Sequence, residues 1–155
     1  MDSKTYILAE YEQYLPNNIT CTASSVYDAR FTCKNLIDNN QKTSWVSNGE
    51  GIGAWVKLEF LDNIHVKGLK FSHRRDTEQA FKDIQIEFPN GLKYNRTLAN
   101  QTAPIDIDAD SNGLVGSVNI TAVDVWGDIQ LTINNGYEDI EVYISEKGKN
   151  DCSNG

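Results

Sequence analysis

Apolar residues recur at every second position in several short segments of the chain, and this alternation predicts β-strands that each bury one face. Helical spacing is nowhere sustained in the sequence. With the opening run Tyr6-Ile7-Leu8 and the segment 20–25, about eight strands are expected, which is typical of a sandwich or jelly roll. The alternating segments cover residues 54–60, 84–88, 118–122, 129–133 and 140–144.

Breaks in the alternation predict where strands bend or turn. The phase slips at Gly68, as an extra residue in a β-bulge would make it do. Pro89-Asn90-Gly91 lies between two apolar positions, and Asn-Gly readily adopts the positive φ values of a hairpin turn. The polar segment 95–113 is expected to be a long surface connection that also permits a short edge strand.

Length and composition favour one domain. The chain has 155 residues, of which 39% are hydrophobic and 23% charged, enough for a single compact core. We expect this domain over residues 1–146 and a polar tail over 147–155. The chain shows no apolar stretch of spanning length and no secretory layout at Met1. Its net charge of -8 opposes binding to phosphate backbones, so nucleic acid is excluded as a partner.

The three cysteines have no zinc-binding or redox-motif spacing. Cys21 and Cys33 flank a short loop, and we favour a disulfide between them, which would add about 2 to 3 kcal/mol to the free energy of unfolding. Cys152 lies in the polar tail and could instead pair with Cys21 or with a cysteine outside this chain.

Four N-x-[ST] sequons favour an extracellular protein, secreted or at the cell surface, in which each sequon would lie on an exposed segment. The sixteen asparagines of the chain also generate such triplets by chance. The sequons begin at Asn18, Asn95, Asn100 and Asn119.

Three blocks of sequence carry a resemblance to a known family. They are Thr22-Ala23-Ser24-Ser25, then Asn35-Leu36-Ile37-Asp38-Asn39-Asn40-Gln41-Lys42-Thr43-Ser44-Trp45, and Asn135-Gly136-Tyr137-Glu138-Asp139-Ile140-Glu141-Val142-Tyr143. Together they resemble the coagulation factor 5/8 C-terminal type, or discoidin, domain family over residues 20–145. The segment Phe81-Lys82-Asp83-Ile84-Gln85-Ile86-Glu87-Phe88 is similar to a strand of that family.

The resemblance implies an all-β fold, the galactose-binding-like jelly roll of two antiparallel sheets, which agrees with the strand count. It also implies a binding module without catalytic chemistry, usually part of a larger multidomain protein. No G-x-S-x-G or H-E-x-x-H motif occurs, so the sequence gives no reason to expect an enzyme. The buried tryptophan of the family corresponds to Trp45, which we expect in the core.

Many relatives hold a structural calcium ion, and the resemblance places its ligands at Asp38, Thr43 and Asp139. Oxygen ligands of this kind suit a hard cation, and Asn40, backbone carbonyls or Glu138 would complete the shell. One departure from the family is Asn39, where a glycine is usual, although Asn tolerates a left-handed backbone. Alternatively, Asp38 and Thr43 only cap a turn by local hydrogen bonds.

Ligand binding is expected on loops at one end of the sandwich. The glycine-rich segment 48–53 resembles a recognition loop of the family, and His73-Arg74-Arg75-Asp76 matches the place where sugar-binding relatives carry an arginine. A guanidinium donates paired hydrogen bonds to sugar hydroxyls, and an exposed aromatic ring supplies an apolar platform. Alternatively, these arginines form a solvated ion-pair cluster. The candidate residues are Asn48, Glu50, His73, Arg74, Arg75, Asp76 and Trp126, with Tyr27 as another candidate platform.

The resemblance and the candidate loops lead us to expect one of two functions. The first is a carbohydrate-binding, lectin-like adhesion module, and the alternative is a protein-binding adhesion or matrix module that uses the same loops without sugar binding. Phospholipid binding is disfavoured, because the acidic domain offers few apolar loop residues, mainly Ile52 and Trp126.

Overall fold

The computed structural model describes residues 7–40, 42–74, 80–127 and 134–145 of the chain. This part consists of β-strands and three short 3₁₀ turns, and none of its helical segments is long and apolar enough to cross a membrane. The elements in chain order are η2 (Ile7–Glu10), β1 (Glu12–Gln13), η3 (Pro16–Asn18), β2 (Ile19–Ala23), η4 (Cys33–Ile37), β3 (Trp45–Val46), β4 (Trp55–His73), β5 (Ala80–Phe81), β6 (Asp83–Glu87), β7 (Lys93–Thr97), β8 (Ile105–Asp108), β9 (Leu114–Ala122), β10 (Val125–Trp126) and β11 (Gly136–Ile144).

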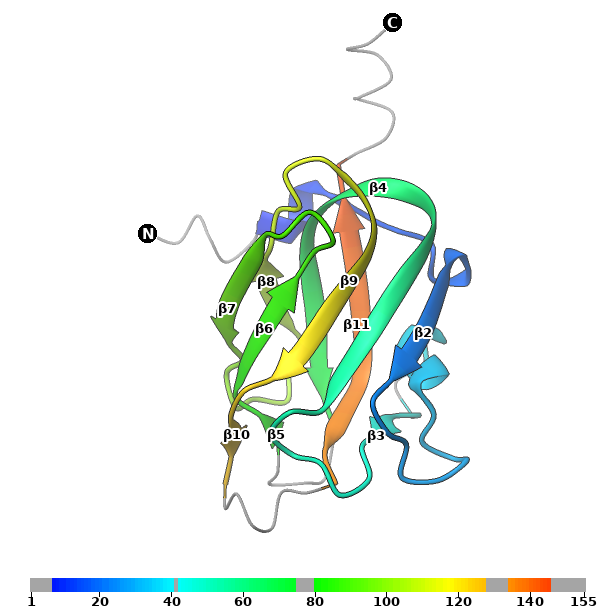
Figure 1. Ribbon diagram of the computed structural model, residues 1–155, viewed down its shortest axis with the longest axis vertical. Helices are drawn as coiled ribbons and strands as arrows, with labels where there is room; N and C mark the ends of the chain where they lie inside the picture. The colour runs from blue at the N-terminus through cyan, green and yellow to red at the C-terminus, as the bar shows by residue number, and fades with distance from the viewer. Residues whose placement is uncertain (1–6, 41, 75–79, 128–133, 146–155) are drawn as a thin grey trace, which may run out of the picture.

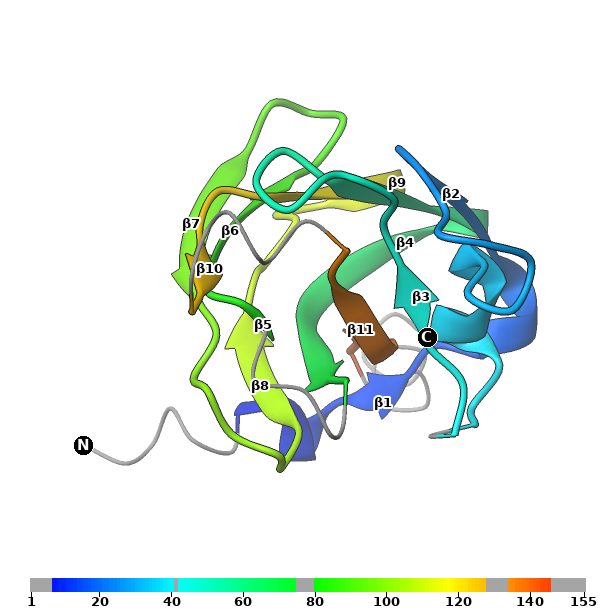
Figure 2. The same ribbon diagram turned by 90° about the horizontal axis from the view of Figure 1, so that it is seen from below.

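The strands form two antiparallel layers packed face to face, which confirms the predicted all-β sandwich (Figures 1 and 2). One layer has the order β2, β4, β9, β6, β7. The other contains β8, β4 and β11, with the short strands β1 and β3 pairing with β11. Strand β4 belongs to both layers, and β5 pairs with β10 beside them.

The alternating apolar residues fill the space between the layers. Four of the five alternating segments, 54–60, 84–88, 118–122 and 140–144, are confirmed as strands whose alternate side chains are buried, and Phe88 continues the pattern just past the end of β6. The segment 129–133, the polar tail and Cys152 lie outside the described residues. The hydrophobic effect on these alternating positions therefore accounts for the layered fold.

An aromatic cluster closes the core below the end loops. The Trp45 ring is 1% exposed and stacks against Phe81 and Tyr137, with ring centroids 6.1 and 5.9 Å away. The Phe71 ring also packs against Tyr137, with ring centroids 5.4 Å apart. Trp45 is therefore a core residue, as expected, and it supports the loops from beneath.

The predicted irregularities are confirmed. The pairing of β4 with β11 shifts by one residue between Gly68 and Val66, so a bulge lies at the expected place. The hairpin of β6 and β7 closes through Asn90 and Gly91, and Gly91 has φ of +96°. The expected connection 95–113 begins later than predicted, because residues 95–97 belong to β7, but it does contain a short strand, β8, which pairs with β4.

Two expectations are corrected. The opening run was expected to be a strand, but its described part belongs to the 3₁₀ turn η2. The turn directs Leu8, 2% exposed, into the core next to Gly68. The alternation predicted a strand over 54–60 only, but one strand of 19 residues, β4, continues from Trp55 through the bulge to His73. Its exposed middle at 61–63 is where the strand leaves one layer for the other.

A disulfide joins Cys21 in β2 to Cys33 in η4, as favoured from the sequence, with 5.6 Å between the Cα atoms. It fixes the start of η4 to the edge of the first layer, next to the loops 24–32 and 38–44. Those loops hold several of the candidate site residues.

Candidate ligand site at one end of the sandwich

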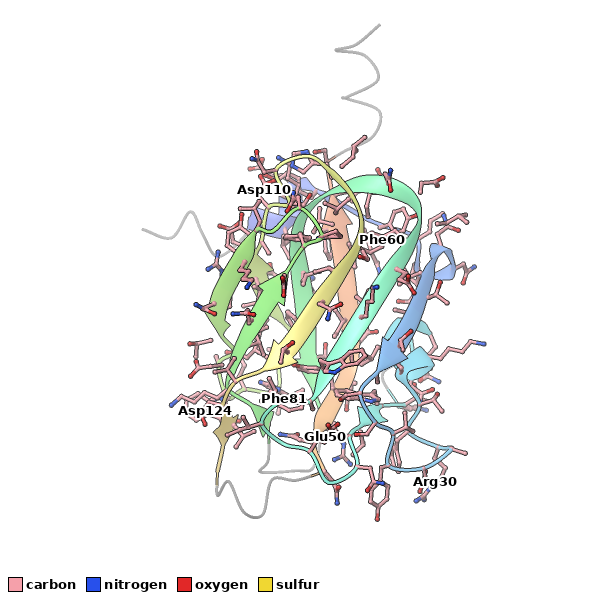
Figure 3. The ribbon with its side chains drawn as sticks, viewed as in Figure 1. Arg30, Glu50, Phe60, Phe81, Asp110 and Asp124 are labelled. Atoms are coloured by element: carbon pink, nitrogen blue, oxygen red, sulfur yellow. A yellow bond between two sulfur atoms is a disulfide. The ribbon has the colours of Figure 1, made fainter. Side chains whose placement is uncertain are left out.

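Several candidate ligand residues lie at the same end of the sandwich. Figure 3 shows Glu50 and Arg30 at this end and Asp110 at the opposite end. Here the loops after β2 and β3 meet the end of β4, where His73 and Arg74 lie. The structure therefore brings together loops that are far apart in the sequence. Arg75 and Asp76 lie outside the described residues.

Glu50 joins two of these loops. Its Oε1 atom accepts hydrogen bonds from the hydroxyls of Ser24 and Ser25, at 2.7 and 2.6 Å. The same hydroxyls accept bonds from the backbone N–H groups of Trp55 and Asn48, at 3.0 and 2.9 Å. A carboxylate that accepts two hydroxyl bonds is held in one orientation. Glu50 is therefore positioned rather than free to rotate.

The loop 47–54 is also tied to the start of β11. The Ser47 N–H donates to the Asn135 carbonyl at 2.8 Å, and the Asn135 N–H donates to the Ser47 hydroxyl at 3.1 Å. The Gly49 N–H donates to the Asn134 side chain at 2.8 Å, and Gly49 has a positive φ of 72°. The glycine-rich loop thus has a defined shape.

Arg74 extends over an aromatic ring at this end. Its Cζ atom lies 5.7 Å from the centroid of Phe31, and Arg30 lies 5.0 Å from the same ring. Arg30 is held by Asp28 at 2.7 Å, whereas Arg74 has no ion pair or hydrogen bond with any residue of the described ranges. Burial lowers the pKa of the Arg74 guanidinium, and the Glu138 carboxylate opposes that shift.

Tyr27 lies beside this pair. Its ring is 45% exposed and meets Phe31 edge to face, with centroids 6.0 Å apart. Tyr27, Phe31 and Arg74 together present an exposed ring next to guanidinium donors that no described residue accepts from. This combination suits a ligand with an apolar face and hydroxyl groups.

His73 is buried beneath the loops instead of being presented at their surface. It is 6% exposed, and its Nε2 atom hydrogen bonds to the Ala99 carbonyl at 2.9 Å. The Nδ1 atom is buried without a partner among the described residues. Burial lowers the pKa of His73, against the effect of the Ala99 carbonyl. Direct contact of this ring with a ligand is therefore not favoured.

Trp126 is also less available than expected. Its indole N–H donates to the Leu98 carbonyl at 2.8 Å. The Lys82 ammonium lies 4.8 Å from the ring centroid and covers one face of the half-buried side chain. Among the described aromatic side chains at this end, Tyr27 is thus the better platform.

The Asp38 loop, the candidate calcium site, is closed by local hydrogen bonds. The Asp38 carboxylate accepts from the Asn40 N–H at 2.9 Å and from the Thr43 hydroxyl at 2.5 Å. Asn39, the departure from the family, adopts φ of 60°, the left-handed conformation that a glycine would take. These bonds also fit the alternative of a simple capped turn.

Asp139 lies close to this loop, although it is almost one hundred residues away in sequence. Its side chain is 3% exposed. Burial, followed by the carboxylates of Glu141, Asp38 and Glu138, raises its pKa to about 7. A buried carboxyl among other carboxylates is the environment that a bound cation stabilises. No group of three or more His, Cys, Asp or Glu side chains in the described ranges is spaced as a metal cluster.

Sequence reasoning missed the residues that organise the site. Ser24 and Ser25 were noted only as part of a family block, and Phe31 and Asn134 were not singled out. The contacts of Ser24, Ser25 and Asn134 join segments 25 to 85 residues apart, which alternation cannot encode.

Comparison with known sequences gives a family. The family described as "Domain of unknown function (DUF7402)" matches residues 16–143. The chain belongs to this family. No curated protein matches it.

Solved structures match the DUF7402 chain in fold. A family 32 carbohydrate-binding module from Clostridium perfringens NanJ, in complex with galactose, has a TM-score of 0.72 and 15% identity over 86% of this chain and 98% of that one. An F5/8 type C domain from Bacteroides fragilis has a TM-score of 0.71 and 14% identity over 88% and 98%. Chitosan-binding module 2 from a Paenibacillus sp. IK-5 chitosanase/glucanase, in complex with chitotriose, has a TM-score of 0.67 and 18% identity over 84% and 99%. The fold is the discoidin-type, galactose-binding-like sandwich.

Proposed function

We propose that this domain is a non-catalytic, extracellular carbohydrate-binding module of an adhesion or cell-surface protein, and that it binds sugar through its end loops. The observation that carries the proposal is the position of the Arg74 guanidinium. It is half-buried and lies over the Phe31 ring, and no described residue accepts a hydrogen bond from it. Tyr27 and the fixed Glu50 lie at the same end and supply a platform and an acceptor. Structural neighbours named as galactose- and chitotriose-bound modules support this chemistry.

Replacing Arg74 by Ala tests the site. We expect the variant to bind at least about ten-fold more weakly, because a charged donor contributes roughly 1.5 to 3 kcal/mol. Galactose, N-acetylgalactosamine and chitotriose would be titrated by NMR. Arg96→Ala is the matched control, since Arg96 also lies over a ring, Tyr94 at 4.7 Å, but belongs to β7. Unchanged binding by the Arg74 variant would contradict the proposal.

Protein binding is the second candidate, and exposed apolar residues favour it. Tyr27, Ile52 and Val123 belong to loops of this end and are 45, 47 and 49% exposed. Such residues suit an interface with another extracellular protein. A response to none of the sugars, together with binding to a protein partner that Ile52→Ser removes, would favour this function.

We also propose a structural calcium ion held by Asp38, Asn40, Thr43 and Asp139, with backbone carbonyls completing the oxygen shell. The crowded carboxylate of Asp139 and the ordered Asp38 loop support it. Calcium should raise the unfolding temperature, and a chelator should lower it, because the ion binds only the folded state. Asp139→Asn should remove this difference. An identical unfolding temperature in calcium and in chelator would refute the site.

The extracellular location rests on the disulfide and the sequons. Asn95 and Asn100 are exposed, whereas Asn18 and Asn119 are half-buried. Secretion from a eukaryotic host followed by mass spectrometry tests this, with glycans expected first at the two exposed sites.

A further inference from the structure

The outer face of one layer is a polar surface that the end-loop site does not use. It belongs to β2, the first half of β4, β9, β6 and β7, and it faces the viewer in Figure 1. Val56, Leu58, Val118 and Ile120 are at most 1% exposed and point into the core, so the residues between them point outward.

Side chains on this face form continuous rows across the strands. The first row joins all five strands through direct pairing partners, Thr22, Lys57, Asn119, Glu87 and Lys93. A second row runs through Trp55, Thr121, Gln85 and Asn95. Neighbouring strands lie about 4.8 Å apart, so the first row extends over roughly 19 Å.

The face has a shallow hollow beside the end of β6. A cavity of about 280 Å³ lies over the middle of the first row. Its lining residues are Lys57, Glu87, Phe88, Pro89, Ser117 and Asn119. The side chains of Lys57, Ser117 and Asn119 offer donors, and those of Glu87, Ser117 and Asn119 offer acceptors, as a ligand rich in hydroxyl groups requires.

The surface adjoins the end-loop site through Trp55. The Trp55 backbone exchanges two hydrogen bonds with Ser24, at 2.9 and 3.0 Å. Ser24 in turn donates to Glu50. Trp55 is half-buried at the border of the face, where its ring can pack against the C–H face of a sugar.

Charge indicates which ligand fits. On this face the strands carry three carboxylates and two lysines. The carboxylates are Glu59, Asp83 and Glu87, and the lysines are Lys57 and Lys93. The face is therefore nearly neutral in a chain of net charge -8. An anionic polymer would be repelled by the whole molecule, whereas a neutral one would not.

We propose that this face is a second carbohydrate site, which binds an internal stretch of a neutral oligosaccharide or polysaccharide chain. The inference extends the proposed function from a single sugar at the end loops to a chain that continues across the sheet. Binding of successive residues to two adjoining sites raises the affinity for a polymer above that for a monosaccharide.

NMR titration of the ¹⁵N-labelled chain separates the two sites. The probes are galactose, N-acetylglucosamine, soluble β-1,4-galactan and chitohexaose, with polygalacturonate as the anionic comparison. Because Asn95 and Asn119 of this face are both sequons, the protein is made in a host that attaches no N-glycans. We expect monosaccharides to shift end-loop amides such as Glu50, and one of the neutral polymers to shift Trp55, Gln85 and Asn119 as well.

Variants decide whether the face contributes binding energy. The double variant Gln85→Ala with Asn119→Ala should weaken polymer binding by about ten-fold, the effect of losing hydrogen bonds worth roughly 1.4 kcal/mol in total. Its monosaccharide affinity should stay unchanged. Asp108→Ala in β8, on the other layer, is the matched control and should bind like the wild type.

The outcomes distinguish the two proposals. Polymer shifts confined to the end loops, or a double variant that binds polymer normally, would overturn the sheet site alone. Shifts on the sheet face without any in the loops would overturn the end-loop site alone. No shift with any probe, or stronger binding of polygalacturonate than of neutral polymers, would count against the neutral sheet site.

Discussion

His73 ends strand β4 at the ligand end, yet its ring is only 6% exposed. Its Nε2 atom bonds to the Ala99 carbonyl, and its Nδ1 atom has no partner within the described residues. A second proton would therefore have to sit on a buried nitrogen without an acceptor. This is the physical reason why burial lowers the pKa of His73 in the folded protein.

We predict that His73 makes the fold less stable in acid. His73 of the unfolded chain takes up a proton near pH 6.5, whereas His73 of the folded protein does so only at a lower pH. Above pH 6.5 both states are neutral and the free energy of unfolding keeps its full value. As the pH falls below 6.5, the proton binds the unfolded chain first and the free energy of unfolding decreases. Urea unfolding between pH 8 and pH 5 measures the loss. His73→Gln should flatten the profile. An unchanged slope in the His73 variant would contradict the burial argument.

At the scale of elements, Gly68 shows why a bulge occurs where the alternation slips. A methyl group on Gly68 would overlap the Leu8 side chain and come within 2.7 Å of the Ile107 carbonyl oxygen. Only a residue without a Cβ lets η2 and β8 approach β4 this closely. The bulge and the 3₁₀ turn therefore depend on each other.

Gly68→Ala is expected to destabilise the domain by about 1 to 3 kcal/mol, as overpacking of a core does. Gly116→Ala is the matched control, because the nearest atom there is the end of the Asn63 side chain, 3.1 Å from the new methyl. Denaturant unfolding of both variants gives the comparison. Equal stabilities would show that η2 can move away at no cost.

Strands were predictable where one face is buried, as in 84–88 and 118–122, because alternation reports burial directly. The continuity of β4 was not, since its exposed middle at 61–63 looks like a loop in the sequence. The very short strands β1, β3, β5 and β10 have two residues each, too few for a period. Their existence depends on pairing partners that only the folded chain provides.

At the scale of the whole molecule, the candidate site was predictable only where the resemblance supplied it. Asp38 and Asp139 come close enough for their charges to interact, as the family pattern implies. The bonds of Ser24 and Ser25 to Glu50 connect two loops about 25 residues apart in sequence, and no local pattern predicts them. The hydrogen bond of the buried His73 to the Ala99 carbonyl likewise joins distant segments, so no local pattern predicts it.

The Cys21–Cys33 disulfide holds this end of the molecule together, because it fixes η4 to β2 between the loops of the site. A closed loop with a sequence separation of 12 residues limits the unfolded chain enough to contribute about 2 to 3 kcal/mol. We predict that the double variant Cys21→Ser with Cys33→Ser loses this amount in denaturant unfolding. Wild-type protein in reducing agent should match the variant.

Cys152→Ser is the control for that measurement, and it should unfold at the wild-type denaturant concentration. The double variant should also bind sugar more weakly than its fraction folded explains, because the loop 24–32 between β2 and η4 carries Ser24, Ser25 and Phe31. Its ligand affinity would be measured where the protein is fully folded. Wild-type affinity there, despite the lower stability, would show that the hydrogen bonds of Glu50 hold the loop without the disulfide.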